Sequence, residues 1–298
     1  MTDDVMFYGI YSEGYRPATQ NRNAGKLASN QSGVYEGYVV PAVAVTDTLE
    51  NIEFGMKGEF LDRTLRLNAS IYWAEITDLQ VARFDPSNVA FLVFMENVGD
   101  ADSNGIDVDF QWAPTNNLTI SGAASFLSTE ITRVNDQLQG VAVPVGSDLP
   151  LAPDFSGNLR ARYDFELPGM GANAYLTGSL TYRGESLAGV VGSAAFMDDT
   201  ALLVTGSASG LGIEDAGGNF GTVTDSTGSL PANTRFINES ATVLSASAGI
   251  MKDSWLAEVY VRNLTSERGA IVQTAGKFTP EASVNRPRTI GLRLSYRF

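Results

Sequence analysis

The sequence predicts an all-β protein, an antiparallel transmembrane β-barrel portion of about ten strands with short turns at one end and long loops at the other. Three observations predict this fold. Apolar and polar residues alternate with a period of two in many segments, as in strands whose two faces meet different environments. Short and long connections strictly alternate. The expected strands, at roughly 10–20 residues, are also longer than the average of about five or six in soluble proteins.

The alternation places each strand. It is clearest at the end of the chain, where every second residue from Ile290 to Phe298 is apolar or aromatic and the residues between them are polar, cationic or glycine. The same pattern recurs in the segments 64–73, 104–112, 118–126, 155–164 and 254–263. We therefore expect strands at residues 4–16, 47–61, 64–82, 90–113, 117–132, 152–166, 171–186, 235–251, 254–273 and 284–298.

The connections between these strands differ in length. Short turns are expected at 61–64, 113–117, 167–171 and 252–254, and longer loops at 17–46, 83–89, 133–151, 187–234 and 274–283. All 11 prolines fall in turns, loops or strand entrances, as expected when strand interiors are hydrogen-bonded on both sides. Because the 90–113 segment is long for one strand, we expect a bulge in it at Gly99 or Gly105.

The positions of the three tryptophans favour a membrane barrel over a soluble β-sandwich, in whose strands apolar and polar residues also alternate. Trp73, Trp112 and Trp255 all lie on the apolar face of their strands. Trp112 and Trp255 flank short turns, whereas Trp73 lies about ten residues from its turn, the length of a tilted strand that crosses a bilayer. We therefore expect these three residues to form aromatic girdles at the two membrane interfaces.

Composition excludes several classes of function. The chain of 298 residues has no cysteine and no histidine, so disulfides, zinc–thiolate sites and histidine general bases are absent. A net charge of −14 argues against nucleic acid as a partner. No apolar run is long enough for a transmembrane helix, and the start "MTDDVMFYGI" lacks the regions of a signal peptide.

Two segments near the start carry motifs of a known family: "VMFYGIYSEGYRPATQN" (5–21), and 49–81, which ends in Asp–x–Gln. The first is similar to a strand and loop of TonB-dependent outer-membrane receptors, and the second to the hairpin that follows in that family. The segment "ENVGDADSNGIDVDFQWAP" (96–114) resembles another strand, although Asp107 stands where Glu is usual. The segment "VYVRNLTSERG" (259–269) resembles the penultimate strand, so the likeness spans essentially the whole chain.

The resemblance implies a domain assignment. Members of the family carry a signal, a TonB box, a plug and a barrel of about 22 strands. Residues 1–298 correspond to the C-terminal portion of that barrel, without the plug and the N-terminal strands. A truncated gene model, a gene fragment and a free-standing small barrel remain alternatives.

The resemblance also implies a function and partners. We expect a multi-pass barrel in the outer membrane of a Gram-negative bacterium, part of a receptor for TonB-coupled uptake of a siderophore-iron, cobalamin or oligosaccharide ligand. A passive porin-like barrel is the alternative. An outer-membrane barrel enzyme is disfavoured because such proteases and lipases use histidine, so we expect no catalytic residue, cofactor or metal site. Partners would be membrane lipid and lipopolysaccharide, the barrel-assembly machinery, the TonB complex through the missing N-terminal part, and a small molecule.

The expected site residues fall into two groups. Outer loops bind ligand in this family, which points to the aromatic and cationic residues Tyr15, Arg16, Arg22, Arg83, Phe84 and Phe220. Tyr296 and Phe298 match the C-terminal aromatic signal that the assembly machinery reads.

Three acidic groups have simpler explanations than a metal or catalytic site. The segment "DADSNG" (100–105) resembles half of an EF-hand, but Gln111 stands where the bidentate Glu belongs. Asp107 and Asp109 are expected to be compensated by arginines on the polar face: Arg66, Arg160, Arg162 and Arg183. For Asp198, Asp199, Glu214 and Asp215 a solvated loop is favoured over a cationic ligand or a divalent bridge to lipopolysaccharide.

Overall fold

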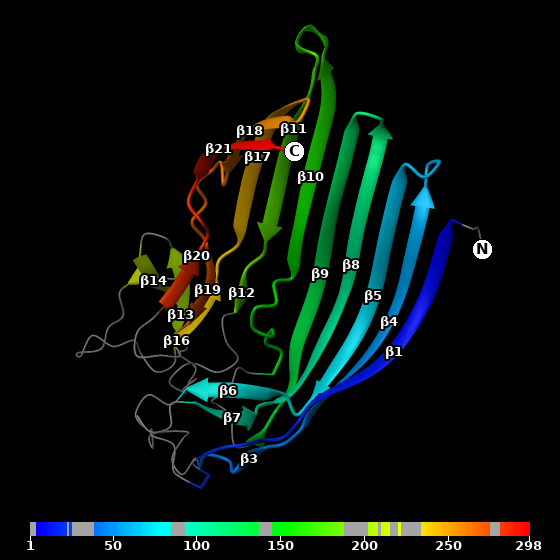
Figure 1. Ribbon diagram of the computed structural model, residues 1–298. Helices are drawn as coiled ribbons and strands as arrows, with labels where there is room; N and C mark the ends of the chain where they lie inside the picture. Colours follow the sequence, from blue (N-terminus) through cyan, green and yellow to red (C-terminus); the bar gives the residue numbers. More distant parts are fainter. Residues whose placement is uncertain are drawn as a thin grey trace.

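The computed structural model describes most of the chain (Figure 1). The described residues are 4–22, 24–25, 39–84, 93–136, 145–187, 202–207, 210–214, 220–221, 234–274 and 281–298. Among them no helix is long and apolar enough to cross a membrane. The expected residues Asp198, Asp199 and Asp215 lie outside this set.

One antiparallel sheet of ten strands forms the body of the molecule, so the predicted fold class is confirmed. Its order is β1-β4-β5-β8-β9-β10-β11-β17-β18-β21, so each strand pairs with the main-sheet strands before and after it in the chain. The bounds are β1 (Val5–Arg16), β4 (Asp47–Phe60), β5 (Leu65–Thr77), β8 (Gly99–Thr115), β9 (Leu118–Val134), β10 (Phe155–Leu167), β11 (Ala172–Arg183), β17 (Ala241–Lys252), β18 (Trp255–Arg262) and β21 (Thr289–Tyr296).

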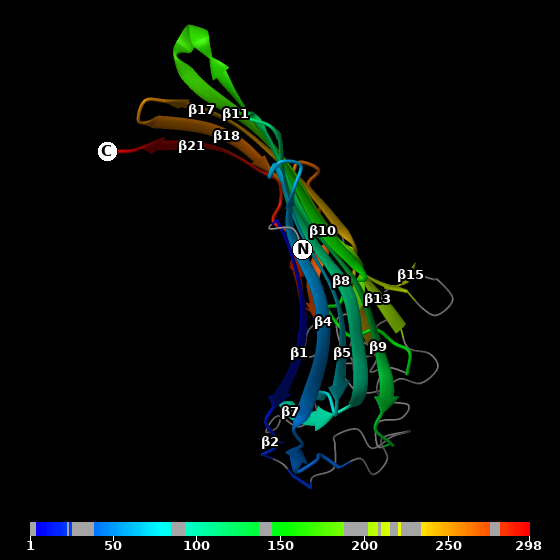
Figure 2. The same cartoon turned by 90° about the vertical axis from the view of Figure 1, so that its right-hand side faces the viewer.

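This sheet is open. Within the described part of the chain, β1 pairs only with β4 and β21 only with β18. Seen from the side it is a curved and twisted wall, in which β17, β18 and β21 bend away from the other strands (Figure 2). The four short turns lie at one end, together with both chain termini, and the small sheets lie at the other (Figure 1). The third turn is a single 3-10 turn, η3 (Pro168–Met170).

Smaller sheets make up the loop-side end. Two are hairpins with no strand in the main sheet, β2 (Thr19–Gln20) with β3 (Val43–Ala44) and β6 (Gln80–Phe84) with β7 (Val93–Asn97). A third hairpin joins β19 (Ala270–Thr274) to β20 (Glu281–Val284). A five-stranded sheet contains β12 (Ser186–Leu187), β13 (Leu202–Ser207), β14 (Gly210–Glu214), β15 (Phe220–Gly221) and β16 (Thr234–Asn238).

The sequence prediction joined strands that the structure separates. The expected strand 64–82 is β5 followed by β6, with Asp78 at a φ of 55° between them. The expected strand 90–113 is β7 followed by β8, and the break falls at Val98, just before Gly99. A Cβ atom at Gly99 would lie 1.8 Å from the Arg133 carbonyl oxygen, so only glycine fits there.

The same error recurs in the second half of the chain. Four expected strands each overlap two observed ones: 171–186 overlaps β11 and β12, 235–251 overlaps β16 and β17, 254–273 overlaps β18 and β19, and 284–298 overlaps β20 and β21. Asn263, at a φ of 52°, follows the last residue of β18.

The predicted bulge lies beside Gly99 and not at Gly105. The register of β8 and β9 shifts between Asp100 and Ala101. Gly105 keeps a regular register, and its hydrogen atoms leave room for the ring of its cross-strand partner Tyr72. A Cβ atom at Gly105 would lie 2.4 Å from the Tyr72 hydroxyl oxygen. The cross-strand pairs Tyr8–Gly55, Tyr175–Gly249 and Tyr260–Gly291 have the same arrangement.

The most buried described side chains belong to the loop-side end and its border with the sheet rather than to a central core. Val98 and Ala101 are fully buried there, and Glu96 is only 2% exposed. On the sheet, by contrast, large apolar side chains of one face are open, as at Phe54 (56% exposed). This distribution fits a wall whose apolar face meets lipid.

Candidate functional site

The polar face of the main sheet contains a hollow of about 630 Å³. Residues from β1, β4, β5, β8, β9, β10 and β11 line it, among them Tyr8, Lys57, Asn68, Asp107, Asn158 and Arg183. Residues of both charges and several amides line this space. It can therefore form hydrogen bonds with a polar ligand and does not favour one sign of ligand charge.

The charges of this face are paired locally. Arg162 donates to Asp164, two residues away on the same strand, at 2.7 Å, and stacks on the Tyr175 ring at 3.9 Å. Asn68 donates to Asp109 at 2.9 Å. Arg162, one of the four arginines expected to compensate Asp107 and Asp109, thus pairs with Asp164 instead, and Asp109 has an amide partner.

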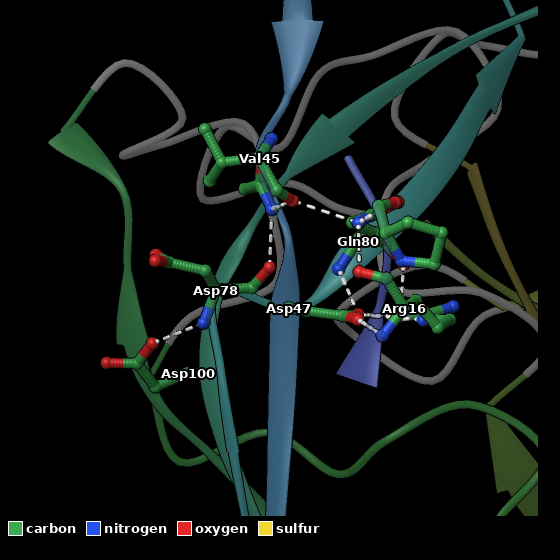
Figure 3. Close-up of polar contacts among 8 residues, drawn as sticks. Arg16, Val45, Asp47, Asp78, Gln80 and Asp100 are labelled. Carbon is green, nitrogen blue, oxygen red and sulfur yellow. Dashed lines mark hydrogen bonds and ion pairs between the residues drawn. The ribbon is translucent and has the colours of Figure 1, made fainter. Parts of the chain in front are cut away.

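A second polar cluster lies where β1, β4 and β5 meet the loop-side end (Figure 3). Asp47, whose side chain is 5% exposed, pairs with the guanidinium of Arg16. The same carboxylate accepts the backbone N–H of Gln80 at 3.1 Å, and Arg16 Nη2 donates to the Gln80 carbonyl at 3.0 Å. Three segments distant in sequence are thereby joined around one buried carboxylate.

An adjacent cluster joins β5, β8 and β9. Arg133 donates to Asp78 at 2.9 Å and to Asp100 at 2.8 Å. Asp100 in turn accepts the backbone N–H of Asp78 at 2.9 Å, which holds this residue in its left-handed conformation at the end of β5 (Figure 3).

The predicted ligand-binding residues do not form one group. Tyr15 and Arg16 are neighbours on β1 and therefore point to opposite faces; Tyr15 is 75% exposed, whereas Arg16 is bonded to Asp47. Arg22 is exposed in a turn. Arg83 and Phe84 lie on β6 and Phe220 on β15, and their side chains are outside the described residues. All six remain predictions.

The predicted assembly and girdle residues are partly in contact. The Trp255 and Tyr296 rings lie 4.8 Å apart, and Tyr296 meets the Phe298 ring edge-on at 5.2 Å. Trp112 pairs across the strands with Leu65 and Ile120 beside a short turn. Their roles at the interface and in assembly also remain predictions.

A row of carboxylates crosses five strands on the face that carries Trp73. Glu75 follows Trp73 by two residues and so shares its face. The register pairs Glu13 with Glu50, Glu50 with Glu75, Glu75 with Asp102, and Asp102 with Glu130. At one end of the row, Tyr11 donates to Glu13. Sequence analysis missed this row because its members are far apart in the chain.

Outside the main strands, two carboxyl groups have perturbed acidity. Burial raises the pKa of Glu239 above its usual value, with smaller contributions from the nearby charges of Glu185 and Glu267. Burial and then Asp154 raise the pKa of Asp148. Among the described residues, no group of three or more acidic side chains is placed to hold a metal ion.

Comparison with known proteins identifies the family of this chain. A family model described as "TonB dependent receptor-like, beta-barrel" matches residues 1–264. The metal-pseudopaline receptor CntO of Pseudomonas aeruginosa is 26% identical over 164 residues, which are 55% of this chain and 19% of that protein.

Solved structures agree along the whole chain. The ferric yersiniabactin uptake receptor FyuA from Yersinia pestis has a TM-score of 0.65 at 17% identity, over 100% of this chain and 36% of its own. The siderophore receptor PiuA from Acinetobacter baumannii has a TM-score of 0.61 at 17% identity, over 99% of this chain and 34% of its own. The chain thus spans about a fifth of that curated relative and about a third of these structures.

Proposed function

The chain belongs to the TonB-dependent receptor-like β-barrel family, and from this premise we propose that it forms part of a receptor for TonB-coupled uptake of a scarce ligand. Its place is the bacterial outer membrane, and the family consists of receptors rather than enzymes. The observation that carries the proposal is the match of the family model over residues 1–264.

The ligand class that we propose is a metal chelate of the siderophore type. Support comes from the names of similar proteins, a metal-pseudopaline receptor and two siderophore receptors. The mixed lining of the polar hollow is compatible with such a ligand, which presents several oxygen atoms and a bulky surface. Cobalamin and oligosaccharide are the alternative classes.

We further propose that residues 1–298 are the C-terminal portion of a larger barrel. The open edges at β1 and β21 support this, because unpaired backbone groups in hydrocarbon cost several kcal/mol each. The remaining part of the receptor would supply the contact with TonB. Lipid and lipopolysaccharide would cover the apolar face, and Trp73, Trp112 and Trp255 would lie at its borders.

The test uses the intact protein in outer membranes. Cells that express it are offered ⁵⁵Fe(III) as a panel of hydroxamate, catecholate and carboxylate chelates. We expect saturable uptake of at least one chelate, abolished by an uncoupler and by loss of TonB. Uptake that persists without TonB, rises linearly with concentration and ignores chelate identity would instead support the porin-like alternative.

We also propose that Phe298 and Tyr296 act in assembly. Phe298 lies just beyond β21, is fully exposed, and extends the aromatic contacts of Trp255 and Tyr296. In the intact protein, deletion of Phe298 should reduce insertion, measured by heat-modifiable gel mobility and surface abundance. Arg297→Gln is the matched control and should insert normally; equal damage from the two changes would contradict the assembly role.

A further inference from the structure

Three neutral amide side chains connect the two loop-side hairpins at a point where backbone pairing ends. The β2–β3 and β6–β7 hairpins belong to different sheets, and neither joins the main sheet. In Figure 1, β6 and β7 run crosswise to the main strands at their loop-side ends.

Asn97 is the first of these amides. Its Oδ1 accepts the Val45 N–H at 2.7 Å, and its Nδ2 donates to the Val45 carbonyl at 3.0 Å. A side-chain amide carries a donor and an acceptor side by side, as a peptide group does. Asn97, the last residue of β7, therefore pairs with the backbone just after β3 as a further strand residue would.

Asn21 repeats this arrangement in the opposite direction. Its Oδ1 accepts the Met95 N–H at 2.8 Å, and its Nδ2 donates to the Met95 carbonyl at 2.7 Å. Asn21 follows β2, and Met95 lies in β7. The two hairpins are thus joined at two places by the same kind of bond.

Gln80 attaches the joined hairpins to the main sheet. Its Nε2 lies within hydrogen-bonding distance of the carbonyls of Val45 (2.9 Å), Pro17 (3.1 Å) and Arg16 (3.3 Å) (Figure 3). The residue is only 4% exposed, so water does not replace these bonds freely. The Val45 carbonyl accepts from both Gln80 and Asn97, which makes the two amides parts of one unit.

We propose that Asn21, Gln80 and Asn97 are positioning residues, an amide clamp that holds the β2–β3 and β6–β7 hairpins as one body on the rim of the sheet and so sets the position of the ligand-capturing loops. The last clause rests on the proposed receptor function. The neighbouring pairs Arg16–Asp47 and Arg133–Asp100 are ionic, whereas the clamp is neutral. The attachment of the hairpins by these amides should therefore not change with salt concentration, whereas attachment by exposed ion pairs would weaken.

The first test measures hydrogen exchange in the intact protein. Gln80→Leu keeps most of the volume but removes the amide donor that lies against the carbonyls of Arg16, Pro17 and Val45. We expect exchange of the segments 39–46 and 93–97 to rise roughly 10- to 100-fold, with no change in 65–77. Gln111→Leu, on the exposed polar face of β8, is the matched control and should leave all these segments unchanged. Unchanged exchange of 39–46 in Gln80→Leu would overturn the proposal.

Two further outcomes of the same measurement are decisive. The double variant Gln80→Leu with Asn97→Leu should exchange less rapidly than the product of the single effects, because both amides hold Val45. A full product would mean two independent contacts and no clamp. High salt should leave amide hydrogen exchange of residues 39–46 in the wild type unchanged. A marked increase in that exchange would show that the ion pairs, and not the amides, hold the hairpins.

The uptake arm separates positioning from folding. For any ⁵⁵Fe(III) chelate of the panel that the wild type takes up, Gln80→Leu should raise KM about fivefold or more at nearly constant maximal rate and surface abundance. A fall in maximal rate alone would show a merely structural role. If the wild type takes up no chelate, the proposed function fails, whereas the exchange results still decide on the clamp.

Discussion

The main sheet and its loop-side rim are stabilised in different ways. Within the sheet, backbone pairing runs through ten strands and large apolar side chains stay open on one face. At the rim, the strands diverge, and buried polar side chains such as Asp47 and Gln80 replace the lost backbone partners. The stability of the sheet therefore depends on whether each residue lies on the apolar or the polar face. The stability of the rim depends instead on specific hydrogen bonds between side chains and backbone atoms.

The largest expected effect comes from placing a charged side chain on the apolar face of the sheet. Leu67→Arg places a charge on the apolar face near mid-bilayer and should cost roughly 2–4 kcal/mol of unfolding free energy. Arg66→Leu, one residue away on the polar face, is the matched control and should cost much less. The measurement is equilibrium unfolding of the intact protein from lipid bilayers, and similar costs for both variants would argue against a membrane-facing sheet.

The next prediction concerns a rim contact outside the clamp. Asn263, 4% exposed at the end of β18, donates to the carbonyls of Glu267 and Arg286 at 2.8 and 2.7 Å and accepts the Glu267 N–H. Asn263→Ala removes all three bonds at a φ of 52° and should cost about 1–3 kcal/mol.

This loss should be local. Hydrogen exchange should increase in residues 263–269, with β5 unchanged. Asn285 lies near the same turn, where its backbone N–H donates to the Gly269 carbonyl. Asn285→Ala keeps that bond and serves as the control. Equal exchange in the two variants would contradict the stabilising role of the Asn263 amide.

A third change tests packing on the polar face. A methyl group at Gly105 must displace the Tyr72 ring, because its Cβ would lie 2.4 Å from the hydroxyl oxygen. Gly105→Ala should therefore cost about 1–2 kcal/mol. Gly178→Ala is a fitting control, since a Cβ atom there meets nothing within 4 Å. Thermal unfolding of both variants compares them, and Tyr72→Ala should rescue Gly105→Ala in part, because the new Cβ atom would also lie 2.9 Å from the Phe126 carbonyl oxygen.

These positions show what the sequence alone could reveal. The faces of Leu67 and Arg66 follow from local alternation, so the ten strands and their parity were predictable. Gly105 was misread as a bulge candidate because its partner Tyr72 is identified only by the register between β5 and β8. The rim was not predictable in the same way, since Gln80 binds the carbonyl of Arg16, 64 residues away, and Val45, 35 residues away. Asp78 and Gln80 lay within a motif of the family, but that motif named no partner.

The smallest expected effect sharpens the comparison where the sheet approaches the rim. Glu75 has a carboxylate directly opposite on both neighbouring strands, Glu50 and Asp102. Like charges in this position are destabilising, so Glu75→Gln should stabilise the protein by roughly 0.2–1 kcal/mol in equilibrium unfolding. Added salt screens the repulsion, and the gain should shrink as ionic strength rises.

The control lies at the end of the same row. Glu130 has one acidic partner, Asp102, because the described pairing of β9 with β10 begins only at Phe126. Glu130→Gln should therefore stabilise less than Glu75→Gln in the same measurement. If Glu75→Gln instead destabilises the protein, the row does not act through like-charge repulsion. Glu75 would then resemble the polar groups of the rim, each of which is stabilised by a specific hydrogen-bond partner.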